Sequence, residues 1–426
     1  MTRVLLLSNT TGYQVRAFDE AAAALGVELV FATDRCHKLD DPWQDRAIPV
    51  RFYDLEASLS AILLQAETRP IDGVIAVGDR SVVLAARAAH ELGIPWHSVA
   101  GAMASADKRR SRAIMAAAGL PSPRFGMIRA SERDIHAGDI GFPCVIKPVG
   151  LSGSRGVIRA NNPRECAGAI WRIRALLARP QIRAARAGLE DELLVEEFIG
   201  GREFALEGLM TEGALSTLAI FDKPDPLDGP FFEETIYVTP SRANEQIQRE
   251  ISASVAEAAW ALDLRHGSIH AECRVNEKGV YVLEVAARPI GGLCSRVLTF
   301  VPAQDAAKPP KLASLEHLLL EHAVGESPAR WIRERRAAAV MMIPIPRRGR
   351  LKSIRGEEDA RVVPGIVDLR ITAKLDQLLE PLPEAGSYLG FIFARGETPE
   401  DAERAVREAH DALSIEIDRE VALRQA

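Results

Sequence analysis

Two acidic residues, Glu272 and Glu284, are the clearest candidates for chemistry in this sequence because a hairpin pattern brings them together. Apolar and polar residues alternate over 268–276, and a largely apolar run follows over 280–285. Between them, Glu277-Lys278-Gly279 reads as a three-residue loop with its glycine in the left-handed conformation. This register places Glu272 directly opposite Glu284. Facing carboxylates repel each other, and oxygen ligands at this spacing suit Mg²⁺, so the pair is a candidate metal site.

The same register defines the neighbours of this pair. Asn276 faces Val280, His270 faces Ala286, and Ser268 faces Arg288. An arginine fork beside a metal pair is suited to phosphoryl transfer. Two alternatives stay open: both acids could point to solvent and pair with Arg274 and Lys278, or another loop register could separate them.

A second group of candidates lies upstream and consists of two lysines and a glycine-rich loop. Lys147 lies within the apolar strand pattern Pro143–Val149, where a charge needs a partner or a purpose. The glycine-rich segment 150–156 follows, and its backbone N–H groups can close over phosphates, although a plain hairpin turn would show the same pattern. Lys108 stands at the start of a helix that runs to about Ala118. A lysine just before the loop favours the phosphate interpretation.

These residues need a scaffold, and the first 105 residues predict an open α/β sheet. Strand patterns alternate with helix patterns: strands at Val4–Ser8, Val27–Ala32 and Gly73–Gly78, and helices at Arg16–Leu25, Asp54–Gln65 and Ser81–Leu92. The first strand is followed by SNTTGYQ rather than G-x-G-x-x-G, so a dinucleotide is not implied. Gly78-Asp79, at the carboxyl end of a strand, is expected either to line a ligand crevice or to form a turn.

Composition limits the class of protein. The chain has 426 residues, of which 47% are hydrophobic and 26% charged, and its net charge of −6 argues against a nucleic-acid partner. No apolar run reaches about 18 residues, so no membrane partner is expected. The five cysteines lie far apart without a C-x-x-C pair, which indicates neither disulfides nor zinc and makes the cytoplasm the expected location.

The order of these candidates along the chain resembles the ATP-grasp superfamily. The order is Lys108, Lys147 with its glycine loop, the strand and turn VEEFIGGREF at 195–204, and then Glu272 and Glu284 with Arg288. Within the superfamily, the pattern from Ser105 to Gly292 is similar to the carboxylate–amine ligases that include the L-amino acid (dipeptide) ligases. The implied fold class is α/β and α+β with several domains: an ATP-grasp fold between a Rossmann-like open α/β N-terminal domain and a small α+β C-terminal domain.

The resemblance, together with the element pattern, divides the chain into four parts. The expected parts are an N-terminal domain at 1–105, an ATP-grasp domain at 106–302 with a mobile lid at about 120–200, a linker and helix at 303–330, and a C-terminal domain at 331–426. The C-terminal domain should have strands near 338–345, 366–373 and 389–395, and a helix that begins at Pro399 with Thr398 as its N-cap.

The resemblance also implies which residues contact ATP. The implied set is Lys108 and Lys147 at the α- and β-phosphates, Ser152, Gly153, Ser154 and Gly156 over the triphosphate, Glu196 with the main chain at Phe198 and Ile199 at the adenine, and Glu203 at the ribose hydroxyls. Lys223 would reach the γ-phosphate, the alternative being a solvated loop lysine.

Further roles concern the metal and the substrates. The resemblance implies that Glu272 and Glu284 hold two Mg²⁺ ions, with Mn²⁺ as an alternative, and that Arg288 grips the transferring phosphoryl group. Gly291 and Gly292 would let backbone amides approach the reacting carboxylate, and Glu234 and Tyr237 would bind an amino acid substrate. Ala286 departs from the family pattern, because many members have a metal-binding asparagine there. His270 would either assist proton removal from the amine or be an ordinary strand histidine.

The implied reaction joins a small-molecule carboxylate to an amine through an acyl-phosphate, with Arg288, Lys147 and Lys223 as the catalytic residues. The amine would be, for example, a second amino acid, and the products would include ADP and phosphate. Two alternative functions stay open. One is a biotin-carboxylase-like or purine-pathway enzyme that activates bicarbonate or formate, and the other is a non-catalytic ATP-binding regulator. A homodimer is the family-based expectation for the assembly.

Overall fold

The computed structural model describes residues 1–9, 15–34, 47–131, 138–184, 192–304 and 312–418. The chain forms two compact units, each built from three stretches of sequence. Unit 1 comprises Met1–Ser122, Ala205–Ile220 and Asn244–Glu334, and unit 2 comprises Pro123–Phe204, Phe221–Ala243 and Arg335–Ala426. The expected fold class, α/β and α+β with several domains, is confirmed. The four-part division along the sequence stays a prediction, and the Pro-rich residues 305–311 of its linker lie outside the described residues.

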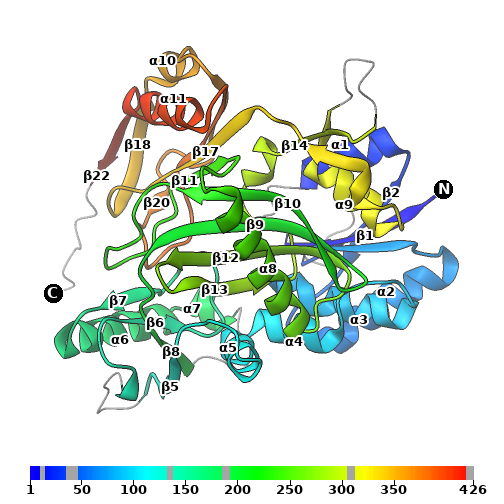
Figure 1. The fold of residues 1–426 in the computed structure, drawn as a ribbon, viewed down its shortest axis with the longest axis horizontal. Coiled ribbons are helices and arrows are strands. Elements are labelled where there is room, and N and C mark those ends of the chain that lie inside the picture. The colour runs from blue at the N-terminus through cyan, green and yellow to red at the C-terminus, as the bar shows by residue number, and fades with distance from the viewer. Residues whose placement is uncertain (10–14, 35–46, 132–137, 185–191, 305–311, 419–426) are drawn as a thin grey trace. The chain divides into compact units, whose positions relative to one another are not determined.

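Unit 1 begins with a parallel sheet of strand order β3-β2-β1-β4, as the alternating pattern predicts. Its strands are β1 (Arg3–Ser8), β2 (Glu28–Thr33), β3 (Ile48–Pro49) and β4 (Gly73–Val77). Helices α1 (Val15–Leu25) and α9 (Leu315–Ala323) cover one face, and α2 (Leu55–Thr68) and α3 (Val82–Leu92) cover the other (Figure 1). Because both faces are covered, β1 is buried along its whole length.

A second sheet of unit 1 carries the hairpin predicted from the sequence. Its strand order is β13-β12-β9-β10, with β9 (Arg202–Thr211), β10 (Ala214–Lys223), β12 (Gly267–Asn276) and β13 (Gly279–Ala286); residues 205–220 of β9 and β10 belong to this unit. The remaining elements are η1 (Asp79–Ser81), α4 (Val99–Ala106), α5 (Lys108–Ala117), α8 (Glu245–Ala261), η3 (Cys294–Val297), β14 (Thr299–Pro302), β15 (Ala313–Ser314), η4 (Pro328–Arg330) and β16 (Trp331–Arg333).

The hairpin turn is tighter than predicted, and a bulge compensates for the difference. Asn276 pairs with Gly279 rather than with Val280, so the loop has two residues and not three. The register then shifts between Cys273 and Glu272, which leaves Leu283 without a partner in the ladder and restores the pairing of Glu272 with Glu284. The carbonyl of Leu283 instead accepts a hydrogen bond of 2.7 Å from Arg112 of α5. The predicted acidic pair is confirmed, but the predicted loop was wrong.

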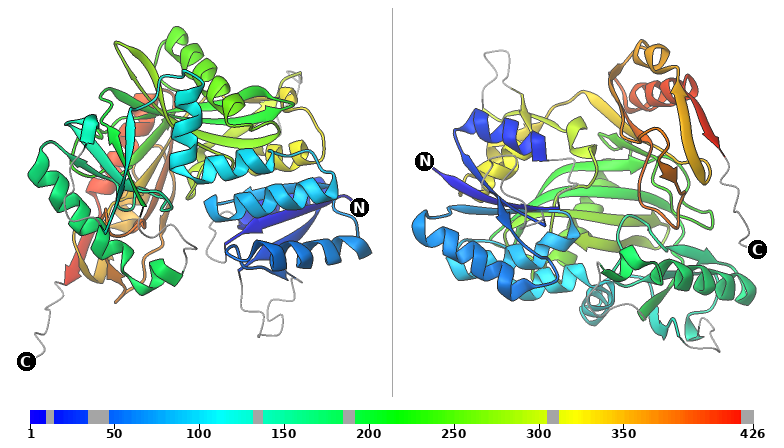
Figure 2. Two further views of the ribbon diagram at one scale, coloured as in Figure 1. Left: turned by 90° about the horizontal axis from the view of Figure 1, so that it is seen from below. Right: turned by 180° about the vertical axis from the view of Figure 1, so that it is seen from behind.

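Unit 2 contains an antiparallel sheet of order β5-β8-β6-β7, formed by β5 (Phe125–Arg129), β6 (Cys144–Pro148), β7 (Ile158–Ala160) and β8 (Glu192–Glu197). Helix α6 (Pro163–Leu177) packs along one face of this sheet (Figure 2). Cys166, Ile170 and Ile173 of α6 are buried against Ile146 and Val195 of the sheet. The short elements η2 (Gly138–Ile140) and α7 (Pro180–Ala184) complete this part of the unit.

The rest of unit 2 is a small α+β domain, as predicted. Its antiparallel strands follow the order β11-β17-β21-β19 and are β11 (Ile236–Thr239), β17 (Ala337–Ile343), β19 (Ile366–Ile371) and β21 (Gly390–Gly396). A smaller sheet of order β20-β18-β22 contains β18 (Gly349–Arg355), β20 (Leu378–Leu379) and β22 (Ser414–Asp418), and α10 (Glu357–Arg361) precedes β19. Helix α11 (Pro399–Asp411) begins at Thr398, whose side chain caps it as predicted.

No helix among the described residues is both long and apolar enough to cross a membrane. The described cysteines, Cys144, Cys166, Cys273 and Cys294, are buried, and none of them forms a disulfide with another described cysteine.

Two buried histidines and one half-buried histidine of unit 1 make its stability sensitive to acid. Burial lowers the pKa of His97 and of His322 to about 4, and burial also lowers the pKa of His266, which stacks on His322. The unfolded chain binds protons near pH 6.5 and the folded chain does not, so stability falls as the pH drops from 6.5 toward 4. We expect a loss of about 2 kcal/mol per fully buried histidine by pH 5.

Urea unfolding at pH 6.5 and pH 5.0 measures this loss. His322→Gln, which keeps a polar atom near Thr211 Oγ1, should lose less stability than the natural protein over the same interval. An identical acid-induced loss in both proteins would contradict the assignment.

Candidate functional site

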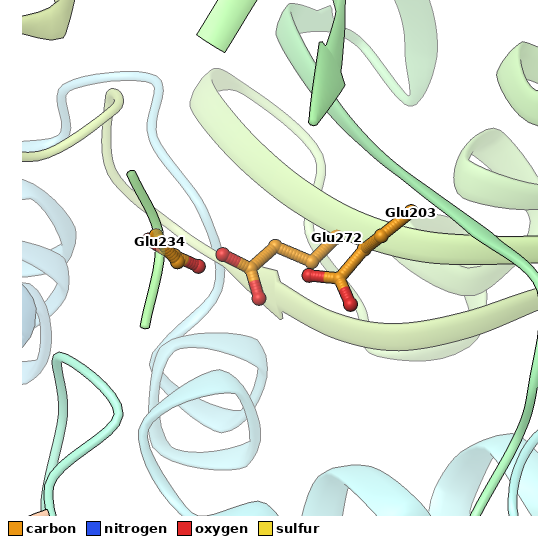
Figure 3. Close-up of side chains that lie close together, drawn as sticks. All are labelled: Glu203, Glu234 and Glu272. Atoms are coloured by element: carbon orange, nitrogen blue, oxygen red, sulfur yellow. The ribbon is translucent and has the colours of Figure 1, made fainter. Parts of the chain in front are cut away.

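The acidic pair of unit 1 lies in the middle of the β12–β13 ladder. Glu272 and Glu284 are direct partners in the register, and both side chains are half-buried (Glu272 is drawn in Figure 3). The same register places His270 opposite Ala286, as predicted. Two carboxylates that face each other across a ladder destabilise it unless a cation lies between them. The donor set therefore fits a hard divalent cation such as Mg²⁺.

Arg288 lies beyond this ladder, because β13 ends at Ala286. The predicted pairing of Arg288 with Ser268 was therefore wrong: the chain leaves the sheet and the side chain turns to Asp79 in η1. Arg288 Nε donates to Asp79 Oδ1 at 2.6 Å, and Nη1 donates to the carbonyl of Pro289 at 3.0 Å. Burial lowers the pKa of Arg288, but the charges of Asp79, Glu284 and Glu207 outweigh burial and keep it above the ordinary value. Asp79, the first residue of η1, therefore also holds the Arg288 side chain.

A buried acid on β9 completes the polar cluster of unit 1. Glu207 is fully buried and accepts hydrogen bonds from the Ile290 amide at 3.2 and 3.1 Å. His270 Nδ1 lies 3.2 Å from Glu207 Oε2, and His270 Nε2 lies 3.9 Å from Glu272 Oε1. Burial lowers the pKa of His270, but its bonds to the two acids outweigh burial and raise the pKa to about 9. Burial raises the pKa of Glu207, against the opposing effect of His270.

In unit 2, Lys147 and Glu196 form an ion pair between adjacent strands. Lys147 on β6 is paired with Leu194 on β8, two residues from Glu196, and Lys147 Nζ is 2.5 Å from Glu196 Oε2. Glu196 is only 3% exposed. The apolar strand pattern around Lys147 predicted that its charge would need a partner, and Glu196 is that partner.

Lys223 of unit 2 is paired with two acids. It is the last residue of β10 and is only 8% exposed, so the alternative of a solvated loop lysine was wrong. Lys223 Nζ donates to Glu203 Oε1 at 2.8 Å and to Glu234 Oε1 at 2.7 Å (both acids are drawn in Figure 3). Tyr237 on β11 donates its hydroxyl to Glu234 Oε2 at 2.8 Å. Four residues predicted separately from the sequence therefore form one network, which carries a net negative charge.

The glycine-rich loop connects β6 to β7. Gly153, Ser154 and Gly156 have φ values of +64°, +54° and +71°, which turn the backbone sharply. A Cβ at Gly156 would lie 2.8 Å from Pro148 Cγ, so this position requires glycine. The amide of Gly156 donates to the carbonyl of Pro383 at 2.8 Å, which links the loop to the C-terminal part of unit 2.

The other predicted residues occupy the following positions. Lys108 is the first residue of α5, after the N-cap Asp107. Ser152 is half-buried in the glycine-rich loop, Phe198 and Ile199 follow β8, and Gly291 and Gly292 follow Ile290. Phe198 lies under the guanidinium of Arg159, whose Cζ is 3.9 Å from the ring centre.

Two parts of the site were not predicted from the sequence. Glu207 stands four residues after Glu203 in the strand pattern, and an acid in so apolar a run was the available signal. The segment 380–386 also touches the glycine-rich loop, and nothing local indicates this contact. Arg172 of α6 holds Glu384 through two bonds, one of 2.8 Å, and Arg179 holds Glu380 at 2.6 and 3.2 Å.

Comparison with known protein families agrees with this geometry. The ATP-grasp domain family matches residues 140–297, and the ATP-grasp N-terminal domain family matches residues 19–96. The chain therefore contains an ATP-grasp domain, preceded by an ATP-grasp N-terminal domain. L-amino acid ligase C-terminal domain 2 matches residues 341–418 of this ATP-grasp protein.

Individual relatives extend the comparison. The chain is 29% identical to a D-alanine–D-alanine ligase from Cupriavidus metallidurans over 47% of its length, and 25% identical to an alanine–anticapsin ligase from Bacillus subtilis over 52%. It spans 60% and 49% of the lengths of these two ligases. The crystal structure of an L-amino acid ligase from Bacillus licheniformis has the same fold, with a TM-score of 0.78, 24% identity, and coverage of 98% of this chain and 99% of that one.

Proposed function

We propose that this ATP-grasp protein is an ATP-dependent carboxylate–amine ligase. It would join the carboxylate of an amino acid to an amine, such as a second amino acid, and release ADP and phosphate. The observation that carries the proposal is the opposed pair Glu272 and Glu284 with the buried Arg288 just beyond the end of their ladder. The two acids can bind metal ions, and the adjacent guanidinium group can donate hydrogen bonds to phosphoryl oxygens. This combination suits phosphoryl transfer to a carboxylate. The proposal includes a homodimer, which rests on the resemblance alone, and a cytoplasmic location, which rests on the cysteine pattern.

The nucleotide would use the residues that the resemblance assigns to it. Lys108 and Lys147 would contact the α- and β-phosphates, and Ser152, Gly153 and Ser154 would cover the triphosphate with their backbone amides. Gly156 already donates its amide to Pro383, so we assign it the role of anchoring the loop. Glu196 and the main chain at Phe198 and Ile199 would bind the adenine, and Glu203 would bind the ribose. Lys147 is held in place by Glu196 before ATP arrives, which reduces the cost of ordering this lysine.

Glu272 and Glu284 would hold Mg²⁺, or Mn²⁺ in its place. When bound, the metal would neutralise charge on the β- and γ-phosphates. Ala286 has no side-chain oxygen to donate, so a water molecule would take the ligand position that asparagine fills in many family members.

The chemistry has two steps. An oxygen of the substrate carboxylate attacks the γ-phosphorus in line, the bond to the β-phosphate oxygen breaks, and ADP leaves. The amine then attacks the acyl carbon of the acyl-phosphate, loses a proton, and displaces phosphate. Arg288 would donate to the oxygens of the transferring phosphoryl group, while the amides at Gly291 and Gly292 approach the carboxylate. Lys223 would contact the γ-phosphate.

The ammonium group of an amino acid substrate would bind at the acidic network around Glu234. An ammonium group is attracted to a site where two acids share one lysine, and Tyr237 holds Glu234 in place. Once Lys223 turns to the γ-phosphate, Glu234 is left with a negative charge that a substrate ammonium can neutralise.

The proposal is tested by phosphate release from Mg-ATP in the presence of amino acids taken singly and in pairs, with mass spectrometry of the products. Release that needs two amino acids and gives a condensed product supports it. Release with bicarbonate or formate alone would move the protein to the other enzyme class, and ATP binding without release for any substrate would favour the non-catalytic regulator.

The ion pair of Arg172 with Glu384 should influence the binding of ATP. The side chains of Arg172 and Glu384 are 38% and 19% exposed. A pair with this exposure contributes about 1 kcal/mol to the stability of the contact, which is roughly a fivefold change in an equilibrium constant. Pro383, next to Glu384, accepts a hydrogen bond from the amide of Gly156 in the glycine-rich loop that would cover the triphosphate. Glu384→Ala should therefore loosen this loop and raise the KM for ATP about fivefold, with little change in kcat.

The charge exchange Arg172→Glu with Glu384→Arg should restore most of this loss. Arg164→Ala changes an exposed arginine on the same helix and serves as the control. An unchanged KM in Glu384→Ala would remove the C-terminal segment from the account of ATP binding.

A further inference from the structure

Glu207 is the most deeply buried acid of the site, and the proposed reaction gives it no role. It lies in the middle of β9 with no exposed surface. Its carboxylate has two polar neighbours in unit 1: the Ile290 amide, which donates to both oxygens, and His270 Nδ1. A buried carboxylate is costly unless such partners satisfy it.

These two partners belong to the two segments that would perform the chemistry. His270 is two residues before Glu272 on β12, and its Nε2 is 3.9 Å from the Glu272 carboxylate. Ile290 lies between Arg288 and Gly291. The segment that carries Arg288 is thus fixed at two points, through Arg288 to Asp79 and through the Ile290 amide to Glu207.

Stability alone does not account for this arrangement. Replacing a buried ion pair by apolar residues of similar volume is often neutral or stabilising. A residue kept for packing could therefore be apolar here, in a strand whose other side chains around position 207 are apolar and buried. What an apolar residue cannot do is hold both a backbone amide and an imidazole at fixed positions.

We propose that Glu207 is a positioning residue of the ligase reaction: it fixes the Arg288–Gly292 segment through the Ile290 amide and orients His270 beside the metal-binding Glu272. This inference rests on the proposed function. Glu207 itself does not touch ATP, metal or substrate. A displacement of about 1 Å of reacting groups lowers a rate roughly a hundredfold, so the effect of losing this anchor should appear in kcat.

Glu207→Gln tests the proposal because the amide has the same shape but no charge, and one of the two oxygens that accept from the Ile290 amide becomes a donor NH2 group. We expect kcat to fall about a hundredfold, with the dissociation constant for ATP within about threefold of the natural value. Glu316→Gln is the matched control: Glu316 is also a buried acid of unit 1, bonded to Ser295 Oγ at 2.7 Å, and its variant should keep kcat within about threefold. A Glu207→Gln enzyme with natural kcat would overturn the proposal.

Hydrogen exchange provides a readout that needs no activity. Peptides covering residues 286–293 should exchange at least about tenfold faster in Glu207→Gln than in Glu316→Gln, at equal resistance to urea. Faster exchange in a protein with no ligase activity would leave the positioning role intact and reject the proposed function. Unchanged exchange in an active protein would reject the positioning role alone.

A second variant tests the same proposal if Glu207→Gln does not fold. His270→Gln removes the nitrogen next to Glu207 and should also lower kcat without weakening ATP binding. In the double variant the two losses should not multiply, because both residues act through one connection. Losses that multiply, or a fully active His270→Gln enzyme, would contradict a shared role.

Discussion

Arg288→Ala is expected to lower product formation at least about a thousandfold while the dissociation constant for ATP changes by less than about threefold. The reason is the position of Arg288. It follows the acidic ladder, is mostly buried, and its guanidinium is oriented by Asp79, which leaves other N–H groups for a phosphoryl oxygen. These bonds would form fully only as the phosphoryl group moves to the carboxylate, so their loss affects turnover and not the binding of ATP.

Arg288→Lys should recover little, because a single ammonium cannot reproduce the planar fork that bonds to Asp79 and to the phosphoryl group together. The control is Arg296→Ala, which removes an exposed arginine from η3 in the following segment. Steady-state kinetics and ATP titration by calorimetry measure both quantities. Normal product formation by Arg288→Ala would remove this residue from the mechanism.

Glu284→Gln is expected to abolish activity that depends on Mg²⁺ and, without metal, to leave the fold as stable as before or more stable. Glu272 and Glu284 face each other in the ladder, and removing one of two like charges relieves repulsion of about 0.5 kcal/mol. Loss of activity together with a gain in stability is typical of a metal site rather than a structural pair. Glu272→Gln should behave in the same way.

The measurements are kcat as a function of Mg²⁺ concentration and thermal unfolding in the presence of a chelator. Glu277→Gln, an exposed acid in the turn of the same hairpin, should change neither. Undiminished activity in Glu284→Gln would reject the metal assignment, and so would a large loss of stability without metal.

The hairpin shows what sequence pattern can and cannot predict. Alternation and the assumed three-residue loop together predicted that the two acids oppose each other, and they do. The predicted turn was one residue too long, and the bulge at Leu283 removed that error. The bulge depends on Arg112 of a distant helix, which donates to the Leu283 carbonyl, and no local pattern contains that contact.

Tertiary partners were the main omission. The charge of Lys147 within an apolar strand predicted a partner, but not that the partner would be Glu196. Lys223 looked equally compatible with a solvated loop, because no local pattern places it beside Glu203, 20 positions before it, and Glu234, 11 positions after it. Asp79 was recognised only as a strand-end residue, since its bond to Arg288 spans 209 positions. Each omission is a contact between separate segments of the chain, and no periodic sequence pattern indicates that such segments will meet.

The contact between segment 380–386 and the glycine-rich loop was beyond local prediction for the same reason. The glycines of segment 150–156 predicted a loop, and Thr398 was predicted to cap α11. Both the loop and the cap are present in the structure. The segment that touches the loop has only prolines, acids and small residues, which are typical of any exposed connection. Its role follows from the bonds of Glu380 and Glu384 to α6 and the adjoining residues.

Transfer of oxygen from the substrate tests the central claim most directly. The amino acid that supplies the carboxylate is labelled with ¹⁸O in both carboxyl oxygens and incubated with Mg-ATP and the amine. If an acyl-phosphate forms, the acyl carbon–oxygen bond breaks when the amine attacks, and each released phosphate carries one ¹⁸O while the product keeps the other. Phosphate without label, formed at the same rate as the product, would contradict the proposed mechanism.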